Sequence, residues 1–331
     1  MPLESYGVLK GSVVDARRED DPNTPHYQVH VRADGTSYRV AVNVKSQVSP
    51  SELLFLVDDR FRHPVVDGLP ELPQGFSGLR SEPGGLALDF IRGNLFDRLQ
   101  LRPLPHNLPG PDNDLSDRVE HYVARARLEH DAEVYVFGER WGPEQDKQDK
   151  VFRFVPGNGV HDIHMNQGND PLFAHDDGVW QDGALVFRFP STDQWVAVFL
   201  AFQSQAWHTD DVTGHAITEP GPTEPDRVVR IVGALVNPIG PAPEPETVTL
   251  LNASPRPIEL AGWKLADRQK NEQSLSGTIA AGTALTVPVR PHVQLGNKGD
   301  IITLLDDQGL KVDGVSYTEQ QAQREGWTLV F

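Results

Sequence analysis

A proline-rich segment, ITEPGPTEPDR at residues 217–227, divides the sequence into two parts. Proline fixes φ and lacks a backbone N–H, so three prolines this close together prevent both a regular helix and a sheet ladder. A segment of this kind is typical of an exposed linker. The chain has 331 residues, which is enough for two domains. We therefore expect an N-terminal domain at 1–216, a linker at 217–227 and a C-terminal domain at 228–331.

Composition indicates an ordinary globular protein. Hydrophobic residues make up 38% and charged residues 23% of the chain. A chain of this length and composition can bury a hydrophobic core that needs no disulfide or metal to stabilise it. The absence of cysteine excludes disulfides, thiolate zinc sites and cysteine nucleophiles. No window reaches the roughly 18 apolar residues of a membrane span, and the first residues show no secretory signal. The expected location is the cytoplasm, with export independent of a signal peptide as the alternative.

The formal net charge is −17, and most of the excess acid lies in the first 225 residues. An acidic surface repels a phosphate backbone, which argues against a broad nucleic-acid surface. It does not exclude a local site that handles a single phosphate group.

Hydrophobic periodicity predicts a β-rich α+β fold for the N-terminal domain. Alternating segments at 26–31 and 38–44 flank Asp34-Gly35, which is a strong hairpin signal. An apolar stripe with helical spacing predicts a helix at 115–130. The segment VFRFVPG, at 151–157, is expected to be a further strand.

The C-terminal domain consists of short apolar runs separated by turn residues, which is typical of an all-β sandwich. The predicted strands are RIVGALVN, ETVTLLN, IELAGWKLAD, TALTVPV, IITLLDD and KVDGVSYT.

The segment GNGVHDIHMNQGN, at 157–169, combines polar and glycine residues in a way that few structural segments require. In an extended conformation, Asp162, His164 and Asn166 would share one face and His161 would point to the other. In a helical turn, the two histidines would share a face instead. Polar neighbours could tune either imidazole. The alternative is a polar turn with exposed histidines.

Two other segments carry candidate site residues. At 24–31 and 41–47, extended strands would place His26 on one sheet face, with Asn43 and Lys45 aligned on the paired strand. A face with histidine and lysine suits an anion or a phosphoester, whereas a water-facing sheet surface is the alternative.

The segment FQSQAWHTDDVTGH, at 202–215, follows the most apolar strand of the N-terminal domain. His208 and Asp210 could hold a divalent metal. Their spacing matches no specific zinc signature, so a solvated loop is the competing interpretation.

Several long motifs within 1–216 resemble the YukJ-like family of uncharacterised bacterial proteins. Because no activity is established for that family, the resemblance implies little about chemistry. The motifs are YGVLKG, TPHYQVHV, VAVNVKSQ, IRGNLFDR, PLPHNLPGPDND, FGERWGPE, PGNGVHDIHMNQGN, GVWQDG and QWVAVFLAFQSQAWHTDD.

The C-terminal part resembles a lamin-tail domain. The resemblance rests on Leu250 to Asn252, Leu260 to Trp263, Gly299 to Asp300 and Asp306 to Gly309. It implies an immunoglobulin-like sandwich that tethers the protein by binding a protein or surface partner. Trp263 is the expected core anchor.

Serine-elbow, P-loop, HExxH and Rossmann motifs are absent from the sequence. The preferred prediction is a hydrolase acting on phosphoesters, either a phosphodiesterase or a nuclease. His164 would be the general base or acid, His161 or His26 its partner, and Lys45 would stabilise negative charge. The predicted substrate-binding residues are Asn166, Gln167, Asn169, Asn43 and Gln203.

Two alternatives stay open from the residues alone. The first is a non-enzymatic ligand-binding or adaptor protein associated with secretion or the cell surface. The second is a polar network with a structural role. Convergence of His26, Lys45, His164 and His208 within one cleft would favour an active site, whereas scatter over opposite faces would favour binding or a structural role.

Overall fold

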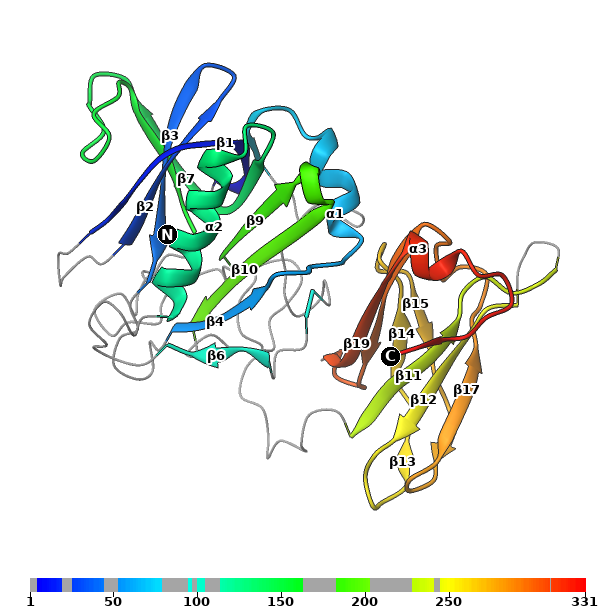
Figure 1. Ribbon diagram of the computed structural model, residues 1–331. Helices are drawn as coiled ribbons and strands as arrows, with labels where there is room; N and C mark the ends of the chain where they lie inside the picture. The colour runs from blue at the N-terminus through cyan, green and yellow to red at the C-terminus, as the bar shows by residue number, and fades with distance from the viewer. Residues whose placement is uncertain are drawn as a thin grey trace.

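The computed structural model describes residues 5–19, 26–44, 53–78, 95–96, 100–104, 114–162, 183–202, 228–240, 245–309 and 311–331. Within these ranges the protein is β-rich and has few helices. Strands β1 to β10 form the N-terminal part and strands β11 to β20 form the C-terminal part (Figure 1).

The N-terminal elements follow the alternating and helical patterns of the sequence. The strands are β1 (Tyr6–Arg18), β2 (His26–Ala33), β3 (Thr36–Asn43), β4 (Leu53–Asp58), β5 (Gly75–Gly78), β6 (Arg102–Pro103), β7 (Glu133–Glu144), β8 (Gly157–His161), β9 (Gly183–Phe189) and β10 (Gln194–Phe202). The helices are α1 (Val65–Gly68) and α2 (Asp114–Leu128), with 3-10 turns η1 (Leu69–Glu71) and η5 (Pro190–Thr192).

Five strands close into a barrel. Residues 12–18 of β1 pair with β2, and residues 6–11 of β1 pair with β7. Strand β2 pairs with β3, β3 runs parallel to β8, and β8 pairs with β7. The circuit β1-β2-β3-β8-β7 therefore returns to β1. This order, with its parallel third and fifth strands, is that of the five-stranded Greek-key barrel of OB type.

Strands β1 and β7 also belong to an open sheet of order β5-β1-β7-β9-β10-β4-β6. One face of this sheet packs, together with the barrel interior, against α2; Phe187 and Val198 belong to this core. The other face, which includes Val186 and Phe199, packs against residues that surround α1. Alternate side chains thus bury both faces of the sheet.

The predicted hairpin between β2 and β3 is confirmed. Asp34 and Gly35 have φ values of 44° and 76°, the positive values that a type I′ turn requires. This turn places His26 opposite Asn43. Alternation then sends the valines of both strands into the barrel and the polar side chains to its outer face.

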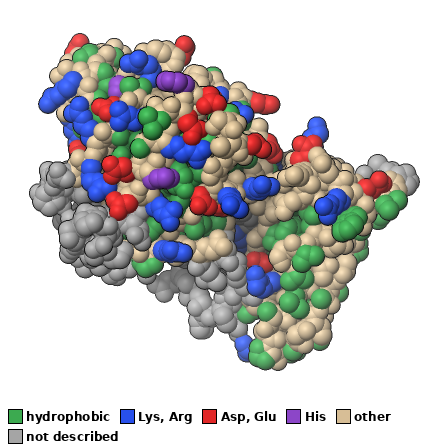
Figure 2. Space-filling model, in the orientation of Figure 1, with side chains coloured by type: hydrophobic (Ala, Val, Ile, Leu, Met, Phe, Trp, Pro, Cys, Tyr) green, Lys and Arg blue, Asp and Glu red, His purple; other side chains and the backbone are tan. Residues whose placement is uncertain are grey.

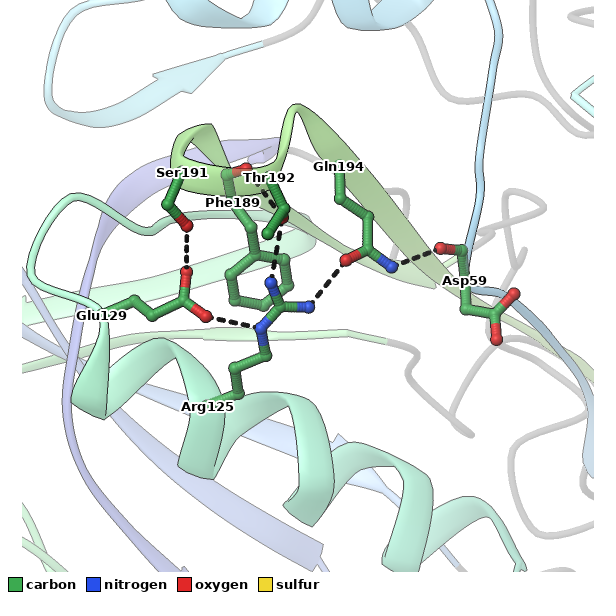
Figure 3. A network of polar contacts seen from close by, with 7 residues as sticks. All are labelled: Asp59, Arg125, Glu129, Phe189, Ser191, Thr192 and Gln194. Atoms are coloured by element: carbon green, nitrogen blue, oxygen red, sulfur yellow. Dashed lines mark hydrogen bonds and ion pairs between the residues drawn. The ribbon is translucent and has the colours of Figure 1, made fainter.

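The predicted helix is confirmed as α2. Its buried stripe, which includes Leu115, Val119 and Val123, packs in the core because these residues share one helical face. Near the end of the helix, Arg125 donates hydrogen bonds to Glu129 at 2.6 Å and to Gln194 at 2.7 Å. Its guanidinium also lies 3.7 Å from the ring centre of Phe189. Figure 3 shows that this network joins α2 to the turn between β9 and β10.

The strand predicted at 151–157 is wrong. Residues 151–156 form an irregular turn, and the strand begins only at Gly157. The Asp149 carboxylate accepts hydrogen bonds from the backbone N–H groups of Val151 and Phe152, and Arg153 has a positive φ of 66°. Side-chain capping of this kind competes with a strand ladder.

The C-terminal part is a sandwich of short strands, as predicted. Sheets of order β17-β12-β11-β20 and β15-β14-β18-β19 enclose one hydrophobic core, and β13 pairs with β16. The elements are β11 (Val229–Leu235), β12 (Thr247–Asn252), β13 (Ile258–Glu259), β14 (Lys264–Ala266), β15 (Glu272–Ser274), β16 (Thr278–Ile279), β17 (Ala284–Pro288), β18 (Gly299–Leu305), β19 (Lys311–Thr318), α3 (Glu319–Ala322) and β20 (Leu329–Val330).

Within this sandwich, the run IELAGWKLAD forms two strands, β13 and β14. The turn between them contains Gly262, with a φ of +86°, in agreement with the turn expected at this glycine. Trp263 is only partly buried but packs against the core, as its predicted anchoring role requires. Asn252 is fully buried, and its side-chain amide donates to the backbone carbonyls of Arg256 and Ile279.

The two parts differ on the surface drawn in Figure 2. There, acidic and basic side chains alternate over the N-terminal part, and hydrophobic side chains gather over the C-terminal part. The exposed large hydrophobic residues of the C-terminal part are Ile239, Trp327, Val330 and Phe331. Among the described residues, none of the helices is both long and apolar enough to cross a membrane.

Candidate functional site

The outer face of strands β2, β3 and β8 brings together three of the predicted site residues. His26 begins β2, Asn43 ends β3 and His161 ends β8. His26 lies opposite Asn43, and His161 lies opposite Ala41 across the parallel pair. The site therefore depends on strand ends that are far apart in sequence but adjacent in the barrel.

The two histidines form a contact pair. Their ring centroids are 4.9 Å apart and their planes meet at 86°, so the edge of one ring meets the face of the other. The side chains of His26 and His161 are 17% and 23% exposed. Both imidazoles thus lie at the surface of the barrel, where solvent or a ligand can reach them.

A carboxylate accompanies each imidazole. Glu19 Oε2 lies 3.5 Å from His26 Nδ1, and Asp162 Oδ1 lies 3.8 Å from His161 Nδ1. These separations exceed the usual length of a hydrogen bond. Each carboxylate oxygen nevertheless lies within ion-pair distance of an imidazole nitrogen, should that ring be protonated.

Asp162 has a structural role as well. It is fully buried, and its Oδ1 accepts a hydrogen bond from the backbone N–H of Asn43 at 3.0 Å. Its own N–H donates to the carbonyl of Ala41 at 3.2 Å. Asp162 thus extends the contact between β3 and β8 and fixes the position of the preceding residue, His161. The segment is extended up to His161, as one of the two predicted conformations requires.

Gly138 of β7 allows the end of β8, at His161, to approach β7 closely. A Cβ at Gly138 would overlap the carbonyl oxygen of His161, and it would also come within 3.0 Å of the Asp162 Cα. Gly138 therefore permits the backbone that carries the imidazole to lie directly against β7.

The other half of the same face is closed. Arg39 Nε donates to Asp149 at 2.7 Å and its Nη1 donates to Gln28 at 2.9 Å, and all three side chains are buried. His30 stacks on Phe152 and Phe154, with ring centroids 5.1 and 5.3 Å away. The connection between β7 and β8 therefore covers this half, so the water-facing sheet surface considered as an alternative is wrong here.

Burial affects His30 in a way that fits a structural role. Its pKa is lowered, mainly because burial disfavours the charged ring and secondly because of the positive charge of Arg32. His30 also contacts the Ser37 hydroxyl at 3.0 Å. Burial therefore favours the neutral form of this ring within the closed half.

The histidine pair can perform acid–base chemistry. An imidazole donates a proton in its charged form and accepts one in its neutral form. Such a pair presents a proton donor beside a proton acceptor, as general acid–base catalysis requires.

Eight of the predicted site residues lie outside the described residues, and their roles stay predictions. They are His164, Lys45, Asn166, Gln167, Asn169, Gln203, His208 and Asp210. Within the ranges that the structure describes, no group of three or more histidine, aspartate or glutamate side chains could hold a metal ion.

Sequence reasoning missed Glu19 and Trp141. Glu19 directly follows β1, which ends at Arg18, and its backbone N–H donates to the carbonyl of His26 at 3.0 Å. The Trp141 ring lies 6.3 Å from that of His161. Pairing of β1 with β2 could have suggested Glu19 from the sequence, because the two strands are neighbours in the chain. The contact of Trp141 depends on the pairing of β7 with β8, whose register is shifted between Trp141 and Glu144.

A separate cavity of about 760 Å³ lies between the two parts of the chain. Its walls include Arg62, Trp195 and Glu319, and it contains none of the predicted site residues. Arg62 donates to Gln320 across it at 3.3 Å. Its walls carry charges of both signs. We place the candidate site at the histidines because three of the predicted site residues meet there.

Comparisons with known proteins agree with the resemblances seen in the sequence. Residues 1–214 match the model of the family described as "Uncharacterized conserved protein (DUF2278)", and residues 223–319 match the Lamin Tail Domain. The chain is 48% identical over 214 residues to "Uncharacterized protein YukJ" of Bacillus subtilis (strain 168), covering 64% of this chain and 93% of that protein.

No solved structure matches the chain. The domain boundaries expected at 216 and 228 stay predictions, since residues 217–227 lie outside the described ranges. The family match extends over more than half of the chain and includes every strand of the histidine site. The chain therefore belongs to the DUF2278 family of uncharacterized conserved proteins and carries a lamin tail domain after it.

Proposed function

We propose that the N-terminal domain hydrolyses phosphodiesters, with His26 and His161 as its acid–base pair. The observation that carries the proposal is the contact of two partly exposed imidazoles, each within 4.0 Å of a carboxylate. Both rings keep part of their surface exposed, at 17% and 23% of the side chain, so a substrate can reach them.

The reaction assigns one proton transfer to each ring. The neutral imidazole accepts a proton from a water molecule as its oxygen bonds to phosphorus. The protonated imidazole donates its proton to the leaving oxygen as the other P–O bond breaks. Exchange with solvent then restores the starting protonation states. In this proposal Lys45 stabilises charge on the phosphoryl oxygens, and His164 can replace either ring as donor or acceptor.

The first experiment measures turnover by the full-length protein. A panel of bis(p-nitrophenyl) phosphate, cyclic nucleotides and short RNA is tested with EDTA or with added divalent metal. We expect turnover of at least one substrate and a bell-shaped dependence of kcat/KM on pH. Turnover that persists in EDTA would show that the reaction does not need the metal predicted at His208 and Asp210.

The variants His26→Ala and His161→Ala test the assignment. Each is expected to lower kcat by about 10²- to 10⁴-fold, the usual contribution of a general acid or base. The melting temperature should change little because both rings lie at the surface. His130→Ala is the matched control, since His130 is exposed on the turn after α2. His164→Ala should behave like the first two variants if His164 belongs to the site.

Full activity in both His26→Ala and His161→Ala would remove the pair from the mechanism. If the wild-type protein binds phosphodiesters but turns over none of them, the adaptor or ligand-binding alternative replaces the hydrolase. In either function, we propose that the lamin tail domain positions the N-terminal domain against a protein or surface partner. Its exposed Trp327 and Val330 support this role.

A further inference from the structure

The Trp141 ring lies against Gly159 on the outer face of the barrel, between Arg39 of the closed half and His161 of the histidine pair. It pairs with Gly159 of β8, and a Cβ on Gly159 would overlap the indole ring. The ring therefore occupies the space that a side chain at position 159 would fill. Because it is only partly buried, the indole keeps accessible surface beside His161, whose ring centroid is 6.3 Å away.

The position of this indole is fixed before any ligand binds. The guanidinium carbon of Arg39 lies 4.6 Å from the ring centre, in a cation–π contact. Arg39 is itself held by the buried carboxylate of Asp149 at 2.7 Å. A preorganised ring loses little conformational freedom on binding, which favours affinity.

We propose that Trp141 is a stacking platform for the base of a small nucleotide whose phosphodiester reaches the histidine pair. The inference rests on the proposed function and names the substrate class of that site. A planar base can stack on an indole regardless of its sequence identity. A base also carries no charge at neutral pH, so this contact tolerates the acidic surface of the protein.

The net charge of −17 favours a cyclic nucleotide, which has a single phosphodiester, over a polymer. Each additional phosphate of a polymer would be repelled by the net negative charge of the protein, whereas one phosphodiester can be matched by one protonated imidazole. Short RNA should therefore bind more weakly per nucleotide than a cyclic nucleotide does.

The test compares binding of AMP, the product of cyclic AMP hydrolysis, and of ribose 5-phosphate to the full-length protein by calorimetry at one salt concentration. These probes share the sugar phosphate and differ in the base. We expect AMP to bind about tenfold more tightly, within the range for stacking on one aromatic side chain. Trp141→Leu should remove this preference and leave the affinity for ribose 5-phosphate unchanged, and Trp141→Phe should retain part of it.

Trp327→Leu is the matched control, because Trp327 is a 64% exposed tryptophan of the C-terminal part of the chain. Equal affinity of the wild type for the two probes, or binding of neither, would overturn the platform. Equal weakening of both probes in Trp141→Leu would assign Trp141 a structural role only. Preference for AMP without turnover of any substrate would support the stacking platform and contradict the hydrolase. Turnover with a KM that does not depend on the base would support the hydrolase and contradict the platform.

Discussion

The two halves of the outer barrel face use similar residues for different purposes. In the closed half, Arg39, Asp149 and Gln28 are buried and bonded to one another. In the open half, His26 and His161 touch each other and keep part of their surface exposed. A polar residue on a sheet therefore becomes a site candidate through what covers it, not through its type.

The largest expected effect is a loss of stability when a substitution disrupts the closed half. Asp149→Ala would leave Arg39 buried without its carboxylate and should lower the free energy of unfolding by about 3–5 kcal/mol. Urea denaturation of the N-terminal domain measures this loss. Lys147→Ala is the control on the same connection: its exposed pair with Glu144, at 2.6 Å, should contribute less than about 1 kcal/mol. Equal effects of the two variants would show that the closed half contributes no special stability.

A smaller loss of stability is expected from a substitution that shifts the backbone of the open half. The Cβ of Gly138→Ala would overlap the carbonyl of His161, so we expect a loss of about 1–3 kcal/mol from overpacking. Because His161 must shift, turnover should fall along with stability. Gly78→Ala is the matched control, since Gly78 has open space around its Cα. Unchanged turnover in a folded Gly138→Ala protein would show that the position of His161 does not matter for the reaction.

The smallest effect concerns the pH dependence of the closed half. The folded-state pKa of His30 is lowered, chiefly by burial. The neutral ring therefore contributes stability that is present above the unfolded pKa of about 6.5 and is lost as the pH falls through the folded-state pKa. His30→Phe keeps a ring between Phe152 and Phe154 but does not titrate. Denaturation between pH 7 and 5 should show a weaker loss of stability for this variant; parallel curves would contradict the assignment.

Local chemistry explains the elements that the sequence predicted. The hairpin at Asp34-Gly35 and the helix α2 follow from contacts between residues close in the chain. The strand predicted at 151–157 failed for the opposite reason. Its apolar residues Phe152 and Phe154 stack on His30, which is distant in sequence, and the Asp149 side chain replaces the ladder with a turn.

The site was predicted only in part. The sequence singled out His26, Asn43 and His161, and the barrel brings them together. It did not single out Trp141, because an aromatic residue in a strand is ordinarily part of a core. The parallel contact of β3 with β8 joins residues more than a hundred positions apart, and no local pattern encodes such a pairing.

By itself, the sequence determined the family, the β-rich character and the histidine-bearing strands, because motifs, periodicity and turn residues are local properties of the chain. Tertiary structure alone decided which polar residues meet and which are covered. Closure of β1, β2, β3, β8 and β7 into a barrel sets that choice. The same closure places two imidazoles in contact at strand ends while the β7–β8 connection covers the neighbouring arginine.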